Sequence, residues 1–133
     1  MGMNIMVGND GTAFGIRIIN YRRSTDHLDE WVFTIELHGR VDQQNSTEFS
    51  GLVNALIDGG AKLLIVDMME LTYIDSTGLG IVINATKKLR GKEGRVAIVN
   101  KNPSVQQIFD LVNLGSFIPI FRSFNEAVNT IRV

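Results

Sequence analysis

The sequence predicts an α/β fold, a mixed sheet of about five strands with four helices in the order ββαβαβαβα. Two strand-like segments, 14–18 and 31–37, come first and alternate apolar with polar residues. Helical and strand-like segments then alternate to the end of the chain, which is typical of strands joined by crossover helices. Residues 62–68 are almost continuously apolar, which indicates a central strand buried on both faces.

The segments before and between the first two strands are polar. Residues 1–13 end in a cluster of Gly, Asn and Asp and are predicted as a flexible lead-in to a domain that spans 14–133. The segment 22–30 is strongly charged and is predicted as a hairpin loop between the two strands.

The remaining elements follow from helix-start signals and short β-branched runs. Asn45 with Glu48 three residues later, and Pro103 after an asparagine, are typical of helix starts. We therefore expect helices over 45–58, 75–90, 102–112 and 123–131. Strands are expected at 95–99 and at 117–121, where a proline favours the edge of the sheet.

The composition limits the classes of function. The 133 residues are 44% hydrophobic and 20% charged, ordinary values for one globular domain. A net charge of −1 gives no reason to expect nucleic acid or an anionic membrane as a partner. The absence of cysteine excludes disulfides, thiol catalysis and cysteine-based metal sites. No apolar run approaches the ~20 residues of a membrane span, and the first residues lack signal-peptide features, so we expect a cytoplasmic protein.

The most informative motif lies between the central strand and the next helix: Asp75-Ser76-Thr77-Gly78-Leu79-Gly80. It places a hydroxyl where unpaired N–H groups and the helix dipole favour negative charge. The residues leave two interpretations of Ser76 open, a helix cap, which local spacing favours, and the acceptor of a phosphate. Each glycine costs a helix about 1 kcal/mol relative to alanine, so their presence suggests a close neighbour in the fold or across an interface.

The order of elements and these motifs together resemble the STAS family, and within it the small bacterial anti-sigma factor antagonists. The resemblance covers residues 14–133. The segments that carry it are 39–42, 64–67, 74–80, 96–100, 105–114 and 118–121.

The resemblance implies a STAS fold and a partner switch. The unphosphorylated form would bind an anti-sigma factor that is also a serine kinase, and so free a sigma factor. Phosphorylation of Ser76 by that kinase would release the antagonist, and a serine phosphatase would reset it. The protein would be a substrate and not an enzyme, with no cofactor of its own. The implied partner surface consists of the acceptor and residues near it: Asp42, Asp75, Ser76, Thr77, Gly78, Leu79 and Gly80.

Three other interpretations have less support in the residues. For an enzyme, the two histidines are His27 and His38, and neither accompanies a nucleophile motif or metal-ligand spacing. For a response-regulator receiver, Asp67 could be the acceptor, but no acidic pair follows the first strand. A STAS module that senses a nucleotide, or serves as regulatory subunit of a non-sigma complex, is the main alternative, although no glycine-rich phosphate motif is present.

Overall fold

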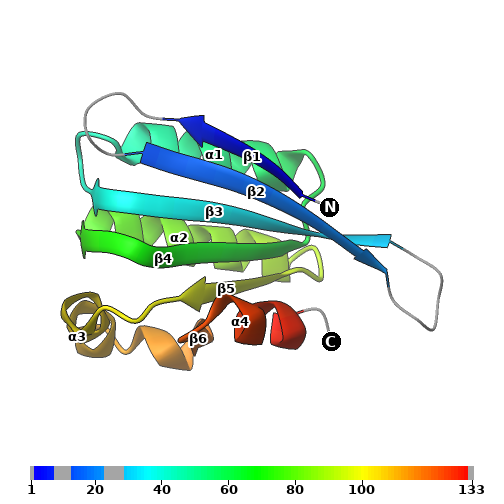
Figure 1. Ribbon diagram of the computed structural model, residues 1–133. Coiled ribbons are helices and arrows are strands. Elements are labelled where there is room, and N and C mark those ends of the chain that lie inside the picture. The colour runs from blue at the N-terminus through cyan, green and yellow to red at the C-terminus, as the bar shows by residue number, and fades with distance from the viewer. Residues whose placement is uncertain (1, 8–12, 23–28, 132–133) are drawn as a thin grey trace.

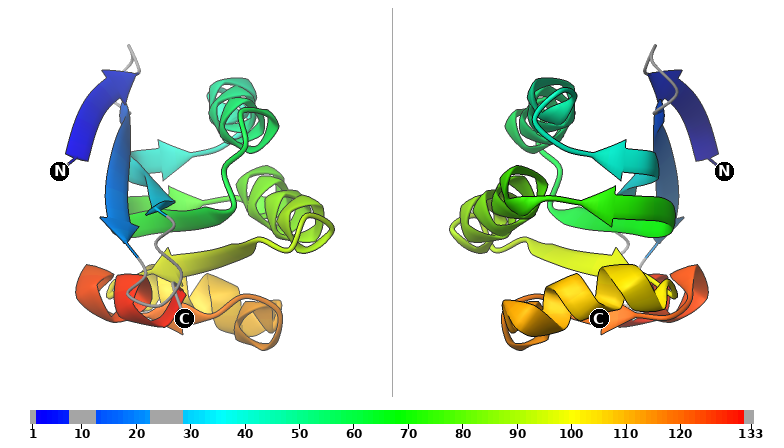
Figure 2. Two further views of the ribbon diagram at one scale, coloured as in Figure 1. Left: turned by 90° about the vertical axis from the view of Figure 1, so that its right-hand side faces the viewer. Right: turned by 90° about the vertical axis from the view of Figure 1, so that its left-hand side faces the viewer.

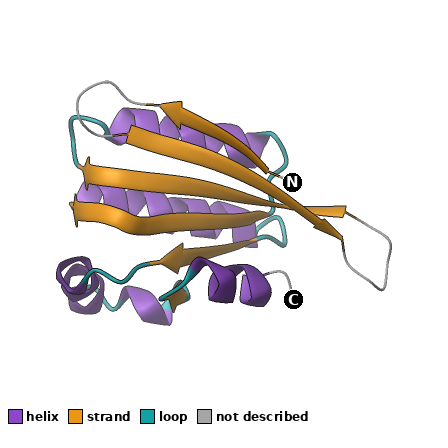
Figure 3. Ribbon diagram, viewed as in Figure 1, coloured by secondary structure: helices purple, strands orange, loops and turns teal. Residues whose placement is uncertain are grey.

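The computed structural model describes residues 2–7, 13–22 and 29–131, and these form one six-stranded mixed sheet with four α-helices (Figures 1 and 3). The strands follow one another across the sheet in chain order, β1-β2-β3-β4-β5-β6. Their bounds are Gly2–Val7 (β1), Ala13–Arg22 (β2), Asp29–Val41 (β3), Leu63–Ile74 (β4), Arg95–Val99 (β5) and Ile120–Phe121 (β6). The first three strands are antiparallel, whereas β3 to β6 run parallel because helices connect them.

The helices cover both faces of the sheet unequally (Figure 2). Their bounds are Ser46–Asp58 (α1), Ser76–Arg90 (α2), Pro103–Leu111 (α3) and Phe124–Ile131 (α4), with a short 3₁₀ turn at Leu114–Ser116. Helices α1 and α2 lie on one face, and α4 lies on the other. None of the helices in the described ranges is long and apolar enough to cross a membrane.

Strand β4 supplies side chains to a separate hydrophobic cluster on each face. Leu64 and Val66 join the larger cluster, which packs under α1 and α2. Leu63 and Ile65 join the smaller cluster under α4. The prediction that the apolar run within residues 62–68 forms a central strand buried on both faces is therefore confirmed.

The first strand differs from the sequence prediction. Residues 1–13 were expected to be a flexible lead-in, yet Gly2–Val7 pairs along its whole length with β2 and makes a sixth strand. The cluster of Gly, Asn and Asp at 8–11 dominated the local pattern. The pairing that forms β1 depends on β2, a partner that a local pattern does not contain.

The last strand also differs, because only Ile120–Phe121 of the expected segment 117–121 pairs with β5. Pro119 has no N–H to donate, but its carbonyl accepts a hydrogen bond from Ile98 N at 2.9 Å. The edge position predicted from the proline is confirmed, since β6 ends the sheet.

Asp67 lies in the middle of β4, beside Glu36 of β3 in the strand register. Its carboxylate accepts a hydrogen bond from Met69 N at 3.0 Å. Burial raises the pKa of Asp67 above its usual value of 3.8; the Met69 N–H opposes this rise and the neighbouring Glu36 charge adds to it. The ionised form of Asp67 is therefore less favourable in the folded protein than in the unfolded chain.

We predict that Asp67→Asn stabilises the protein at pH 7. Because the pKa of this carboxyl is higher in the folded protein than in the unfolded chain, the folded protein binds the proton more tightly. The free energy of unfolding of the parent protein therefore falls as pH rises from 3.8 through the folded pKa. Melting temperatures between pH 4 and pH 8 should show the advantage of the variant growing across that window. Glu70→Gln, which changes an exposed carboxylate of the same strand, serves as the control. An advantage independent of pH would contradict the prediction.

Candidate functional site

The parallel direction of β3, β4 and β5 brings the three loops that follow them to one edge of the sheet. Parallel strands end at the same edge, and sites of α/β proteins gather there. Val41 and Ile74, the last residues of β3 and β4, are partners in the register. Asp75 N donates to the carbonyl of Val41 at 3.1 Å. Asp42 and Asp75 therefore follow two adjacent strand ends, although they are 33 positions apart in the sequence.

Asp75 is the residue that caps α2. Its backbone is extended (φ −98°, ψ −176°), and its side chain accepts a hydrogen bond from Gly78 N at 3.0 Å. Helical geometry begins one residue later, at Ser76. The interpretation of Ser76 as the cap is therefore wrong, because the aspartate before it already performs that role.

Ser76 is exposed at the first position of α2, and so is Thr77 beside it. Within the described ranges, the Ser76 hydroxyl makes no hydrogen bond to the protein. The first turn of a helix favours an anion because its N–H groups point outward and the dipole is positive there. The serine is thus available for chemistry without any loss of a contact that holds the fold.

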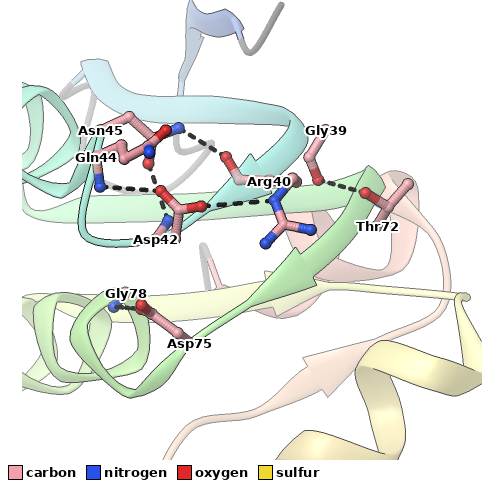
Figure 4. A network of polar contacts seen from close by, with 8 residues as sticks. All are labelled: Gly39, Arg40, Asp42, Gln44, Asn45, Thr72, Asp75 and Gly78. Atoms are coloured by element: carbon pink, nitrogen blue, oxygen red, sulfur yellow. Dashed lines mark hydrogen bonds and ion pairs between the residues drawn. The ribbon is translucent and has the colours of Figure 1, made fainter.

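Asp42 builds the turn between β3 and α1 (Figure 4). Its Oδ1 accepts a hydrogen bond from Gln44 N at 2.9 Å, and its backbone N donates to Oδ1 of Asn45 at 3.0 Å. Asn45 was predicted to cap α1, but its side chain makes no cap hydrogen bond. Instead its Nδ2 donates to the carbonyl of Arg40 at 2.7 Å. The buried amide of Asn45 fixes the loop that presents Asp42.

The two glycines of the motif have different environments. A Cβ on Gly78 would lie 2.7 Å from Cγ1 of Ile74 and 2.8 Å from Cγ1 of Val41. Only glycine allows α2 to start this close to the strand ends. A Cβ on Gly80 would meet nothing within 4 Å. The fold therefore requires Gly78, whereas Gly80 leaves an open spot on the surface of α2.

The structure divides the seven predicted surface residues into two groups. Gly78 and Leu79 are buried against the sheet and support the site from beneath. The other five are exposed or half-buried and lie on the two adjacent loops and the first turns of α2: Asp42, Asp75, Ser76, Thr77 and Gly80.

One pair of side chains at this edge was given no role in the sequence prediction. The guanidinium of Arg40 lies 4.7 Å from the centre of the Tyr73 ring, and its Nε is 3.5 Å from Oδ2 of Asp42. Both side chains are exposed, at 58% for Arg40 and 39% for the Tyr73 residue. The available signal was the position of Arg40 near the end of the strand, two residues before Asp42.

The residues of the competing interpretations lie elsewhere. His38 Nε2 is 3.7 Å from a Glu36 oxygen on β3, and Asp67 is in the middle of its strand and not at its carboxyl end. His27 falls outside the described residues. Across residues 2–7, 13–22 and 29–131, no three His, Asp or Glu side chains lie together so as to hold a metal ion.

A cavity of about 250 Å³ is lined by residues that include Arg90, Arg95, Phe121 and Ile131. This volume is below the ~300–1,000 Å³ usual for ligand pockets. None of its lining residues belongs to the loops around Ser76. The cavity therefore adds no nucleotide site to the serine motif.

Comparison with known proteins gives a consistent result. The family model of the STAS domain matches residues 23–127. The anti-sigma-B factor antagonist of Listeria monocytogenes is 26% identical over 98 residues, which are 74% of this chain and 82% of that protein.

Solved structures show the same fold. A crystal structure of an anti-sigma factor antagonist from Mycobacterium paratuberculosis has a TM-score of 0.72 at 19% identity, covering 89% of this chain and 95% of that one. The Bacillus cell fate determinant SpoIIAA in its phosphorylated form has a TM-score of 0.60 at 20% identity, covering 86% and 99%. With the family model matched across both adjacent loops, from before Asp42 to beyond Gly80, the chain belongs to the STAS domain family.

Proposed function

We propose that this protein is an anti-sigma factor antagonist that acts by partner switching in the cytoplasm. Its unphosphorylated form binds an anti-sigma factor that is also a serine kinase, and this binding frees the sigma factor. Phosphorylation of Ser76 then releases the antagonist, and a serine phosphatase restores it. The observation that carries the proposal is the exposed Ser76 hydroxyl at the start of a helix that a different residue caps.

The comparisons support this role. The Listeria relative is itself named an anti-sigma-B factor antagonist. The SpoIIAA structure is of a phosphorylated form, so a protein with this fold carries a phosphate.

The proposed chemistry requires only an acceptor from this chain. Oγ of Ser76 attacks the γ-phosphorus of ATP, the bond to the ADP oxygen breaks, and the hydroxyl proton passes to a base on the kinase. ATP and magnesium are bound by the kinase. The antagonist contributes the position of the hydroxyl, which the Asp75 cap and the packing of Gly78 hold at the sheet edge.

The charge added by the phosphate is large enough to drive release. A phosphoserine carries about −1.5 to −2 charges at neutral pH. Two like unit charges ~4 Å apart repel by about 4 kcal/mol at an effective dielectric near 20. A loss of that size weakens a complex nearly a thousandfold. A partner surface that accepts the carboxylates of Asp42 and Asp75 would meet this additional charge at the first residue of α2, next to Asp75.

The same phosphate should leave the fold intact. The Ser76 side chain makes no contact that the fold needs, and the first turn of α2 favours an anion. Release therefore follows from a change in the surface and not from unfolding.

We predict that incubation with the cognate kinase and ATP phosphorylates the protein on Ser76 alone, as mapped by mass spectrometry. Ser76→Ala should abolish incorporation, because the proposed acceptor oxygen is removed while the neighbouring Thr77 hydroxyl remains. Thr77→Ala is the matched control, since it deletes the neighbouring exposed hydroxyl but keeps the acceptor, and phosphate should still be incorporated on Ser76. Phosphate incorporation into the Ser76→Ala variant at the normal level would disprove the assignment.

We predict opposite effects for alanine at the two glycines of the motif. Gly78→Ala should lower the free energy of unfolding by roughly 1–3 kcal/mol, because its Cβ collides with Ile74 and Val41. Gly80→Ala should raise the free energy of unfolding by up to ~1 kcal/mol, because the helix gains propensity with no collision. Denaturant titrations measure both changes.

The affinity of the kinase for variants of Gly80 tests whether this residue belongs to the partner surface or has only a structural role. Gly80→Ala should weaken binding if the partner packs against this open spot. The control is Gly51→Ala, an equally open position on α1, which should gain stability and bind the kinase unchanged. Unchanged binding by the Gly80→Ala variant would remove Gly80 from the proposed surface.

A further inference from the structure

Arg40, near the carboxyl end of β3, makes two side-chain contacts that do not use its terminal guanidinium nitrogens. Its guanidinium stacks over Tyr73 at 4.7 Å, and Nε forms an ion pair with Asp42 at 3.5 Å. Among the described residues, its two terminal nitrogens make no hydrogen bond. The side chain is 58% exposed. The terminal nitrogens of Arg40 can therefore donate hydrogen bonds to an anionic group introduced close to them.

The strand register places Arg40 on the strand next to the one that leads into the loop of Ser76. Arg40 pairs with Tyr73, and the next pair, Val41 with Ile74, ends both strands. The contact with Asp42 shows that the guanidinium extends toward this end of the sheet (Figure 4). Ser76 stands two residues beyond Ile74, immediately after the cap. The arginine thus lies on the neighbouring strand, at the level where the α2 loop leaves the sheet.

We propose that Arg40 is an internal phosphate ligand, which exchanges its ion pair with Asp42 for one with the phosphate on Ser76. This inference rests on the proposed phosphorylation of Ser76. The exchange is favoured because a phosphate carries up to twice the charge of a carboxylate and matches the fork of the guanidinium in a bidentate pair. The Tyr73 ring remains in contact with the arginine and acts as the pivot.

The exchange would change the surface at two loops with one modification. Asp42 loses the arginine that partly neutralises it, so its carboxylate becomes a bare negative charge. The phosphate in turn is partly neutralised by Arg40. The kinase that docks on the unphosphorylated protein would then meet an altered β3–α1 loop as well as an altered α2 start. Release would depend on both changes.

The test measures the second pKa of the phosphate, which is ordinarily about 6. Phosphoserine is placed at position 76 during translation, and the ³¹P chemical shift is followed from pH 4 to pH 9. The charged side chains of the loops and first turns around Ser76 are Arg40, Asp42, Glu48, Asp75 and Lys101. A cation in direct contact with the phosphate, about 4 Å from its charge, lowers its pKa in water by about three quarters of a unit.

Arg40→Gln should therefore raise the pKa of the phosphate by about three quarters of a unit. The matched control is Lys101→Gln, which removes the same charge from the exposed residue of the β5–α3 loop. Its effect should be clearly smaller. Arg40→Lys keeps the charge and should restore most of the shift. Equal shifts in the Arg40→Gln and Lys101→Gln variants would overturn the proposal.

The design separates this inference from the proposed function. Because phosphoserine is introduced during translation, the experiment needs no kinase. It therefore shows whether Arg40 binds the phosphate even if no kinase phosphorylates Ser76. A melting curve of each variant confirms that the fold is retained. If Arg40→Gln fails to fold, the ¹⁵N shift of Arg40 Nε, recorded with and without the phosphate, gives the answer in the parent protein. An Nε shift unchanged by the phosphate would likewise overturn the proposal.

Discussion

The site depends on one residue, Asp75, which binds the sheet and the helix together. Its backbone N donates to Val41 at the end of β3, and its carboxylate accepts from Gly78 N in the first turn of α2. The first bond joins the loops after β3 and β4, and the second sets where helical geometry begins. Because Asp75 makes both hydrogen bonds, the Ser76 side chain is not needed to hold the sheet and the helix together. This separation of roles would let Ser76 take up the proposed phosphate while Asp75 maintains the fold.

The loops around Ser76 are fixed by packing and hydrogen bonds, so a phosphate on Ser76 would have a defined position. Gly78 brings α2 into contact with Val41 and Ile74, and a Cβ there would force the helix away. In the adjacent β3–α1 loop, Asn45 and Asp42 are joined by two hydrogen bonds that close the turn. The third loop is fixed as well, since Asn102 Nδ2 donates to the carbonyl of Leu71. A partner therefore meets a preformed surface, and preformed surfaces bind with little cost in ordering.

The sequence predicted the α/β class, the order of the nine strands and α-helices from β2 to α4 and the position of the serine motif, because each rests on local signals. Capping residues, helical periodicity and the apolar run of β4 are properties of neighbouring residues. It failed where a distant partner decides: β1 exists because it pairs with β2, and Asn45 turns from α1 toward Arg40. The role of Arg40 was missed for the same reason, since its contact with Tyr73 spans two strands. Which of two adjacent residues caps α2 depended on backbone geometry, which placed Asp75 and not Ser76 outside the helix.

The central claim is that charge on Ser76, and not a change of fold, controls binding to the anti-sigma kinase. Isothermal titration of that kinase with the protein carrying serine or phosphoserine at position 76 tests it most directly. The account predicts a loss of affinity of at least a hundredfold for the phosphorylated form, with superimposable amide NMR spectra away from the β3–α1 and β4–α2 loops. Equal affinities would contradict the account, and so would a loss of affinity accompanied by spectral changes throughout the sheet.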